Sequence, residues 1–254
     1  MQTVGEIYQF LCELAPPELQ LSFDNAGFLV GRKSSAVTRV LLALDITEPV
    51  VQEAIEQDAQ LIVSHHPVIF GSINRITDQD GGEKLLRLIE NRIAAICMHT
   101  NLDIAQGGVN DVLMRTLGLE PSGALDADGC GRIGTLPSTM PLREFLGLCK
   151  ERLGAEGLRY YDAGKPVSKL AVMGGAGAGA IADAVSAGCD TYVTADVKYH
   201  QFQLAAEHGL NLIDADHYYT ENPVMSDLAE KLRGRFPDLQ IELSQVHKAV
   251  ASFF

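Results

Sequence analysis

The sequence lacks the features that mark several large classes of protein. Its five cysteines are scattered and odd in number, and they form no C-x-x-C pair, so we expect neither a disulfide scaffold nor a thiolate zinc site. No apolar run approaches the roughly 20 residues that cross a bilayer. The first residues, 1–6, have neither the basic start nor the apolar core of a signal peptide. We therefore expect a protein of the reducing cytoplasm without membrane association.

Positive charge is also scarce. The chain has 20 Lys and Arg against 33 Asp and Glu, which gives a formal net charge of −13 at pH 7. Binding to nucleic-acid phosphates needs clustered basic side chains, so general nucleic-acid binding is not expected. The 46% of hydrophobic residues and 21% of charged residues are typical of a globular protein, and 254 residues suit one large domain or two small ones.

The motifs of nucleophilic and nucleotide-binding enzymes are absent or incomplete. No G-x-S-x-G occurs, and Cys97 lies inside an apolar run, where we interpret it as a core residue. A Gly-rich stretch from Met173 to Asp183 links a predicted strand to a predicted helix, but it lacks the P-loop Lys that is followed by Ser or Thr. The stretch either binds an anion at the start of the helix or allows a tight turn with close packing. We favour packing.

Apolar runs of strand length alternate with amphipathic segments along the chain. In the first half, Val37–Asp45, Gln60–Ser64 and Ile93–Met98 are predicted strands, with predicted helices between them. Such alternation predicts parallel crossovers and an α/β fold. The second half repeats the plan without repeating the sequence.

A segment rich in Pro and Gly between Leu119 and Arg132 predicts the boundary between two lobes. We expect a first α/β lobe over residues 1–122, completed by the C-terminal segment 236–254. The second α/β lobe is expected over residues 123–235.

Three predicted strands end in side chains that bind metals. These side chains are His65 and His66 in the first stretch, His99 and Asp103 in the second, and His217 and Glu221 near the C-terminus. Ligands of open α/β sheets bind at the carboxyl ends of the strands, so we expect the three ends to meet in space. Imidazole with carboxylate suits Fe, Zn, Mn, Co or Ni better than Mg²⁺, which prefers oxygen ligands.

The spacing of these side chains favours two metal ions. Consecutive side chains diverge, so His65 and His66 can serve two ions more readily than they can chelate one, and two-metal hydrolytic sites hold their ions roughly 3.5–4 Å apart. His217 and Glu221 are four residues apart, which on a helical turn places them on one face. A single histidine after a strand is more often a polar surface residue. That alternative stays open for His200, while His208 and His247 have no supporting neighbours.

Beyond these patterns, the chain resembles the GTP cyclohydrolase type 2 homologue family, also called Nif-three-like, from end to end. The matching stretches, in chain order, are Asp24–Gly31, Ser64–Phe70, His99–Asp103, Gly131–Gly134, Gly174–Gly177, Thr194–His200 and Asp216–Glu221. The chain departs from the family pattern at Phe23, where Trp is expected, at Ala195, where Gly is usual, and at Gln201, where Asp often follows the His. It resembles the short form without the inserted domain.

The resemblance implies a fold, a metal centre and an assembly. The implied fold is a pair of similar three-layer α/β lobes with the metal site between them, and the implied assembly is a toroidal homohexamer, a trimer of dimers. By the same resemblance, two divalent ions per chain would be held by His65, His66, Asp103, His217 and Glu221, with Glu221 as the bridge.

The expected activity is metal-dependent hydrolysis of a nucleotide-like or other small molecule. His99 and His200 are candidate catalytic residues that could move a proton, and Lys198 and Arg75 are candidates for binding an anionic group of the substrate. The alternative is a metal-binding protein that stores, delivers or inserts metal without turnover.

Overall fold

The computed structural model describes residues 1–79 and 81–253, which divide into two compact units. The first unit comprises residues 1–106 and 225–248, and the second comprises residues 107–224 with the end of the chain from Ala249 on. The division therefore falls earlier than the predicted boundary after residue 122. The physical reason is that Leu113 and Met114, on helix α5 (Val109–Thr116), belong to the hydrophobic core of the second unit.

The first unit is built on a five-stranded sheet with the order β13-β4-β5-β6-β2. Its strands are β2 (Gly27–Val30), β4 (Arg39–Ala43), β5 (Leu61–Ser64), β6 (Ala94–Cys97) and β13 (Gln240–Leu243). β13, β4, β5 and β6 run parallel, and β2 is the antiparallel edge strand. β1 (Gln2–Thr3) and β3 (Ala36–Val37) form a separate antiparallel pair. The C-terminal strand thus completes the sheet of the first unit.

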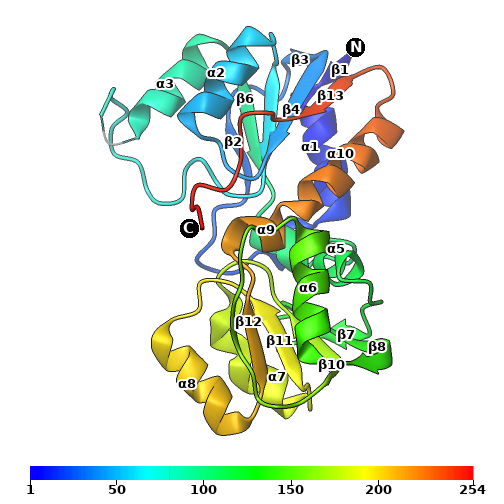
Figure 1. Cartoon of the computed structure of the whole chain (residues 1–254). Helices are drawn as coiled ribbons and strands as arrows, with labels where there is room; N and C mark the ends of the chain where they lie inside the picture. Colours follow the sequence, from blue (N-terminus) through cyan, green and yellow to red (C-terminus); the bar gives the residue numbers. More distant parts are fainter. Residues whose placement is uncertain (80, 254) are drawn as a thin grey trace. The chain divides into compact units, whose positions relative to one another are not determined.

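Helices cover the sheet of the first unit. They are α1 (Val4–Leu14), α2 (Glu48–Glu56), α3 (Gly82–Glu90), α4 (Thr100–Ile104) and α10 (Pro223–Arg235), with a short 3₁₀ turn, η1 (Pro17–Leu19). Apolar residues of α2 and α3 share a buried cluster with alternate residues of β4, β5 and β6. Figure 1 shows α1 against the opposite face of this sheet. α1 begins at a capping box, in which Thr3 and Glu6 bind each other's backbone N–H groups.

The second unit has a six-stranded sheet with the order β7-β8-β10-β11-β12-β9. Its strands are β7 (Gly123–Ala124), β8 (Arg132–Met140), β9 (Arg159–Tyr161), β10 (Val167–Val172), β11 (Thr191–Thr194) and β12 (Asn211–Asp214). β10, β11 and β12 run parallel, while β8 and β9 flank them in the antiparallel sense.

Both faces of this second sheet are covered. Besides α5, the helices are α6 (Leu142–Leu153), α7 (Ile181–Ser186), α8 (Tyr199–His208), α9 (His217–Glu221) and the 3₁₀ turn η2 (Gly177–Ala180). α5 and α6 pack on one face through one cluster, and α7 and α8 pack on the other through a second. The predicted α/β fold class is confirmed. No helix in the described part of the chain combines the length and apolarity that a membrane span requires.

Parallel pairing of the strands places candidate metal ligands at one edge of each sheet. β5 and β6 run in register with Ser64 opposite Cys97, so His65, His66 and His99 follow the same edge of the first sheet. In the second unit, Thr194 of β11 lies opposite Asp214 of β12, which brings Asp196 and His217 to one edge. The segments after these strands are short helices: α4 begins at Thr100, and α9 begins at His217.

A buried ion pair holds part of the second unit together. Arg132, at the start of β8, pairs through Nε with Asp111 of α5, and its guanidinium also donates to the carbonyl oxygens of Gly129 and Gly131. Arg132 and Asp111 are only 7% and 3% exposed. Removing one partner of such a pair leaves a buried charge uncompensated.

We expect Arg132→Met to lower the free energy of unfolding by about 3–5 kcal/mol, because Asp111 is left buried without its cation. Chemical denaturation followed by circular dichroism measures the change. Arg115→Met, at an exposed position of the same helix α5, is the matched control and should shift stability by less than about 0.5 kcal/mol. Equal effects of the two substitutions would contradict the assignment.

Candidate metal centre

Three histidines of the first unit lie together after strands β5 and β6. The ring centroids of His65 and His66 are 4.9 Å apart, and that of His99 lies 5.2 Å from His65 and 5.5 Å from His66. Each ring offers one nitrogen such that the three nitrogens lie within 4.8 Å of one another. These three residues therefore form a group that could hold a metal ion within one unit.

Each of these rings is fixed by an oxygen acceptor at Nδ1. His65 Nδ1 lies 2.8 Å from the carbonyl oxygen of Met98, His66 Nδ1 lies 2.8 Å from Asp45 Oδ1, and His99 Nδ1 lies 2.7 Å from Asp24 Oδ1. A carbonyl or carboxylate oxygen only accepts, so Nδ1 must carry the proton. In the neutral imidazole this leaves the lone pair on Nε2, where a metal ion binds.

The two carboxylates behind His66 and His99 are held in the ionised form. Burial alone would raise the pKa of Asp24, but hydrogen bonds from His99 and Thr100 outweigh it and lower the pKa to about 2. Burial likewise opposes ionisation of Asp45, and hydrogen bonds from His247 and His66 overcome it and lower its pKa. Both carboxylates are therefore charged acceptors at neutral pH.

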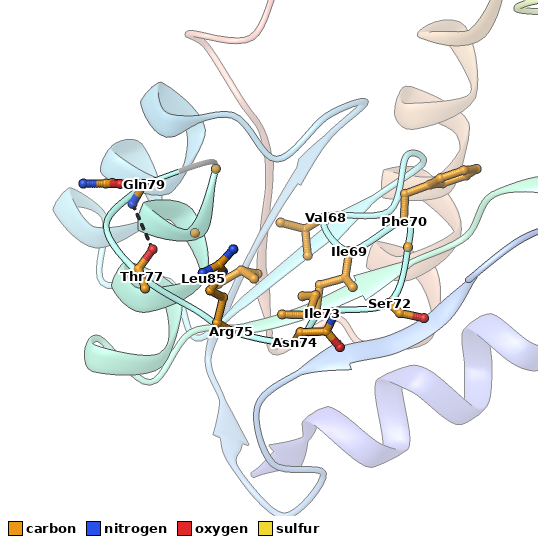
Figure 2. Close-up of a pocket in the computed structure, with 13 residues that line it drawn as sticks. Val68, Ile69, Phe70, Ser72, Ile73, Asn74, Arg75, Thr77, Gln79 and Leu85 are labelled. Carbon is orange, nitrogen blue, oxygen red and sulfur yellow. Dashed lines mark hydrogen bonds between the residues drawn. The ribbon is translucent and has the colours of Figure 1, made fainter.

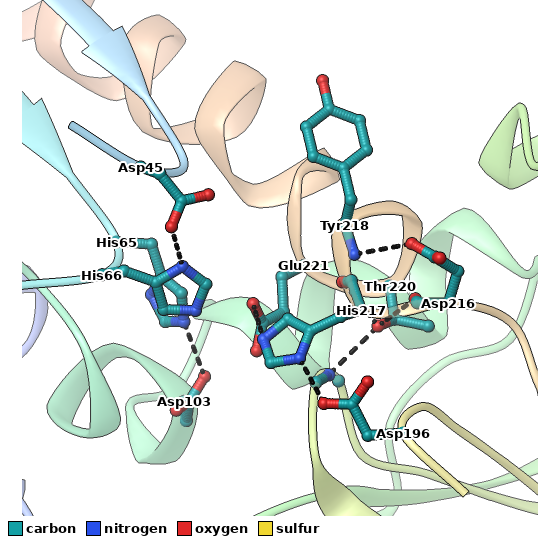
Figure 3. Close-up of polar contacts among 12 residues, drawn as sticks. Asp45, His65, His66, Asp103, Asp196, Asp216, His217, Tyr218, Thr220 and Glu221 are labelled. Carbon is teal, nitrogen blue, oxygen red and sulfur yellow. Dashed lines mark hydrogen bonds and ion pairs between the residues drawn. The ribbon is translucent and has the colours of Figure 1, made fainter. Parts of the chain in front are cut away.

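Asp103 adds a carboxylate to the histidines of the first unit. It lies on α4, the helix that follows His99, and its Oδ1 is 3.6 Å from His65 Nε2 (Figure 3). His65 is fully buried, whereas the side chain of Asp103 is 19% exposed. The nitrogen that His65 would offer to a metal thus faces a carboxylate that could bind the same ion.

In the second unit, α9 carries the other predicted pair. His217 and Glu221 are its first and last residues, and His217 Nε2 lies 3.0 Å from Glu221 Oε2. His217 Nδ1 lies 2.8 Å from Asp196 Oδ2 (Figure 3), which repeats the arrangement of the other three histidines. Burial opposes the charge on His217, but Glu221 and Asp196 outweigh it and raise its pKa to about 9. A metal ion would have to displace this proton, as metal binding to a protonated ligand requires.

Two aspartates beside α9 have unusual backbone conformations. Asp196 and Asp216 have positive φ angles of 53° and 68°, which are uncommon for residues other than glycine. Such conformations cost of order 1–3 kcal/mol each and concentrate at functional sites. Asp216 caps α9 by accepting a hydrogen bond from the backbone N–H of Tyr218 at 3.0 Å.

The Gly-rich turn after β10 packs directly against α9. A Cβ at Gly175, where φ is +63°, would lie 2.0 Å from Glu221 Oε1 and 3.1 Å from His217 Nε2. The N–H of Gly175 donates to Thr220 Oγ1 at 3.0 Å. The absence of a side chain here makes room for the predicted ligands, which supports the packing interpretation of this stretch.

The remaining predicted residues lie in different surroundings. Lys198 and His200 are exposed at the start of α8, where the backbone N–H of Lys198 donates to Gln201 Oε1 at 2.7 Å. Among the described residues, the groups able to hold a metal do not include His200. Arg75 lies in the loop between β5 and α3 and lines a cavity there. Cys97 is 1% exposed and burial raises its pKa, so it is the core residue that the sequence indicated.

Several residues with a role in this geometry were not singled out as site residues. In the sequence, Asp24 marks only the start of a matching stretch and Asp45 only the end of a predicted strand, yet each holds a histidine ring. Asp196 likewise holds His217, and His247 contacts Asp45. An acidic residue directly after a strand was the available signal for Asp45 and Asp196. No comparable pattern marks His247.

The chemistry of the donors fits a transition-metal ion. The first unit offers imidazole nitrogens with their lone pairs on Nε2, and the second offers His217 once its proton is displaced. With the carboxylate oxygens beside them, these donors form a mixture that suits Fe, Zn, Mn, Co or Ni. Among the described residues, the groups able to hold a metal contain no cysteine, and Cys97 donates to the carbonyl oxygen of His65.

Known proteins resemble this chain over nearly its whole length. A protein of Clostridium perfringens named GTP cyclohydrolase 1 type 2 homolog is 37% identical over 240 residues, which cover 91% of this chain and 92% of the relative. A solved Staphylococcus aureus hypothetical protein is 28% identical with a TM-score of 0.91, covering 100% of this chain and 99% of its own. Reduced HcgD from Methanocaldococcus jannaschii is 31% identical with a TM-score of 0.86, covering 96% and 98%.

The family model for DUF34/NIF3, described as NGG1p interacting factor 3, matches residues 2–249. Together with the relative that is 37% identical, this match confirms the resemblance that the motifs indicated. The chain belongs to the DUF34/NIF3 family.

Proposed function

We propose that this protein is a metal-dependent hydrolase with two divalent ions per chain, acting on a small anionic molecule of nucleotide-like kind. One observation carries the proposal: four histidines have Nδ1 within 2.7–2.8 Å of an oxygen acceptor. This arrangement orients each Nε2 atom, for a metal ion in His65, His66 and His217 and for proton transfer in His99. A set of unrelated polar histidines has no reason to share it.

The ligand count favours a centre that both units complete. His217 and Glu221 supply only two ligands, whereas zinc and similar ions take three or four from the protein. The first unit supplies His65, His66 and Asp103. We propose that these five residues together would hold the two ions, with His65 and His66 serving different ions because adjacent histidine side chains diverge. The carboxylate of Glu221 would be available to both.

The ions and the residues around them would have different roles in catalysis. Two bound divalent ions supply the positive charge that polarises a substrate and makes a water molecule acidic near neutral pH. His99 is held by Asp24 beside His65 and His66, and its side chain is 16% exposed. It is therefore placed to accept or donate a proton, which contributes typically 10²–10⁴-fold to a rate.

A cavity lined by the loop that follows His65 and His66 provides a site for the rest of the substrate. Figure 2 shows the loop over residues 68–79, which together with Leu85 of α3 lines a cavity of about 380 Å³. The loop is tied down where Asn25 donates to the carbonyl oxygen of Ile69 at 2.7 Å. Phe70 extends from the same loop to the histidines, with its ring centroid 6.3 Å from that of His99.

The lining of the cavity indicates what kind of group it would hold. Among the described lining residues, Arg75 carries the charge, and Val68 and Leu85 add apolar surface. Arginine recognises carboxylate and phosphate groups through paired N–H donors. We propose that Arg75 binds an anionic group of the substrate while Val68 and Leu85 contact its apolar part. Lys198, exposed at the start of α8, is proposed as a further contact with an anionic group of the substrate, and His200, exposed beside it, as a second residue that could move a proton.

We also propose the assembly that the family resemblance implied, a toroidal homohexamer arranged as a trimer of dimers in the cytoplasm. Light scattering of the purified protein should then give about six times the mass of the 27.4 kDa chain. A monomeric mass at micromolar concentration would contradict the assembly while leaving the metal centre untouched.

We expect His99→Gln to lower kcat by roughly 10²–10⁴-fold with unchanged metal content, because the variant loses proton transfer but no proposed ligand. The assay is a panel of nucleotides and phosphoesters with protein carrying defined metals. His208→Gln, at an exposed position of α8, is the control and should keep wild-type rates. If no substrate turns over and bound metal passes readily to an apo acceptor, the metal-delivery alternative replaces the hydrolase.

Gly175→Ala should weaken metal binding by about 10-fold or more, since the new Cβ would collide with Glu221 and the backbone has a positive φ. Gly179→Ala lies in the same turn, where a Cβ meets nothing within 4 Å, and should bind metal like the wild type. Competition with a chromogenic chelator measures both. Equal affinities would show that the turn does not position Glu221.

Arg75→Met should raise KM by roughly 10–100-fold and leave metal content unchanged, because a hydrogen bond to a charged group contributes about 1.5–3 kcal/mol. Steady-state kinetics on any substrate found in the panel measures the effect. Arg143→Met, at an exposed position of α6, serves as the control. A fall in kcat at constant KM would place Arg75 outside substrate binding.

A further inference from the structure

Asp45 lies between two histidines of the first unit. Its Oδ1 is 2.8 Å from His66 Nδ1, and its Oδ2 is 3.0 Å from His247 Nε2. His247 is far along the chain, in the segment after β13, and its side chain is only 7% exposed. The side chain of Asp45 is 42% exposed, so the two imidazoles hold it in a place where solvent competes for it.

The C-terminal segment is docked so that His247 reaches Asp45. The backbone N–H of Ser244 donates to the carbonyl oxygen of Leu42 at 2.8 Å, which continues the pairing of β13 with β4. Glu53 of α2, which is 7% exposed, then accepts from the N–H of Gln245 at 2.9 Å and from the hydroxyl of Ser244. The N–H of His247 donates to Ser244 Oγ at 3.1 Å.

This docking gives a chain of contacts from the C-terminal segment to a proposed metal ligand. Glu53 fixes the turn at Ser244 and Gln245, the turn places His247, His247 holds one oxygen of Asp45, and the other oxygen holds His66. Each link lies within the first unit. These contacts link the ring of His66 to His247, which lies about 180 residues further along the chain.

We propose that His247 is a positioning residue for the metal ligand His66, acting through Asp45. This role rests on the proposed metal centre. It makes the affinity for the ion on His66 depend on the C-terminal segment. Residues that orient a metal-binding histidine affect metal affinity by about 10–100-fold when they are removed. Without His247, the half-exposed carboxylate of Asp45 is free to turn to solvent, and the ring of His66 loses its fixed orientation.

Thermodynamic linkage gives the proposal a second consequence. If docking of residues 244–248 strengthens metal binding by some factor, metal binding must strengthen the docking by the same factor. The amide hydrogens of Gln245 and His247, which donate to Glu53 and Ser244, report on that docking. The proposal therefore predicts slower hydrogen exchange at these amides when the centre is loaded.

The test uses the full-length protein and Zn²⁺ as the probe, in competition with a chromogenic chelator. We expect His247→Ala to weaken the binding of one of the two ions by about 10-fold, near the lower end of the range for residues that support a ligand, and to leave the other nearly unchanged. His247→Gln keeps a side-chain N–H that can reach Asp45 and should restore most of the affinity. His208→Ala, which is exposed on α8, is the matched control.

Hydrogen exchange of the same proteins supplies a readout that does not depend on activity. In the wild type, Zn²⁺ should slow exchange over residues 244–248, and in His247→Ala this effect should disappear. Wild-type affinity in His247→Ala, or equal weakening of both ions, would overturn the positioning role. Failure of the wild type itself to bind Zn²⁺ would instead refute the proposed metal centre, so the two failures are distinguishable.

Discussion

The structure around the metal-type side chains depends on one constraint: an imidazole can offer a lone pair at Nε2 only when its proton is held at Nδ1. A carbonyl oxygen provides this for His65, and carboxylates provide it for His66, His99 and His217. Each acceptor must itself be placed by the fold. Asp45 follows β4, Asp24 lies in the turn before β2, and Asp196 follows β11 in a strained backbone conformation. The segments that follow the parallel strands therefore carry most of the candidate ligands and two of the carboxylates that hold them, Asp45 and Asp196.

The same constraint explains features that look unrelated in the sequence. The Gly-rich turn after β10 carries no side chain at the point where Glu221 and His217 approach it, so Gly175 leaves room for these two candidate ligands. The strained backbone of Asp196 places its carboxylate at His217. The free-energy cost of the strained backbone is offset by the packing of the sheets that carry these strand ends.

Much of the fold could be predicted from the sequence, because the strands are short apolar runs separated by amphipathic segments. The strands around residues 37–45, 60–64 and 93–98 and the α/β class follow from that pattern and are present in the structure. The division into units was harder to predict, since α5 belongs to the second core through Leu113 and Met114 although it precedes the Pro- and Gly-rich segment. Sequence periodicity identifies an apolar face, but it does not say which sheet that face covers.

Only part of the candidate site could be predicted from the sequence. The metal-type residues follow from tandem and i, i+4 spacing, which are local patterns. The groups that orient them do not, because Asp24 and His99 are 75 residues apart, and Asp45 and His247 are 202 residues apart. Contacts of that separation depend on strand order and on the path of the C-terminal segment. Short motifs carry no information about either.

The central claim is that the prepared histidines and carboxylates hold two metal ions in each chain. Elemental analysis of protein purified without added metal and without chelators tests it most directly. The account predicts about two transition-metal ions per chain, and the number should fall when His65 or His66 is replaced while the fold, followed by circular dichroism, is retained. Fewer than about one ion per chain after gentle purification, with no uptake on adding Zn²⁺, Mn²⁺ or Fe²⁺, would contradict it.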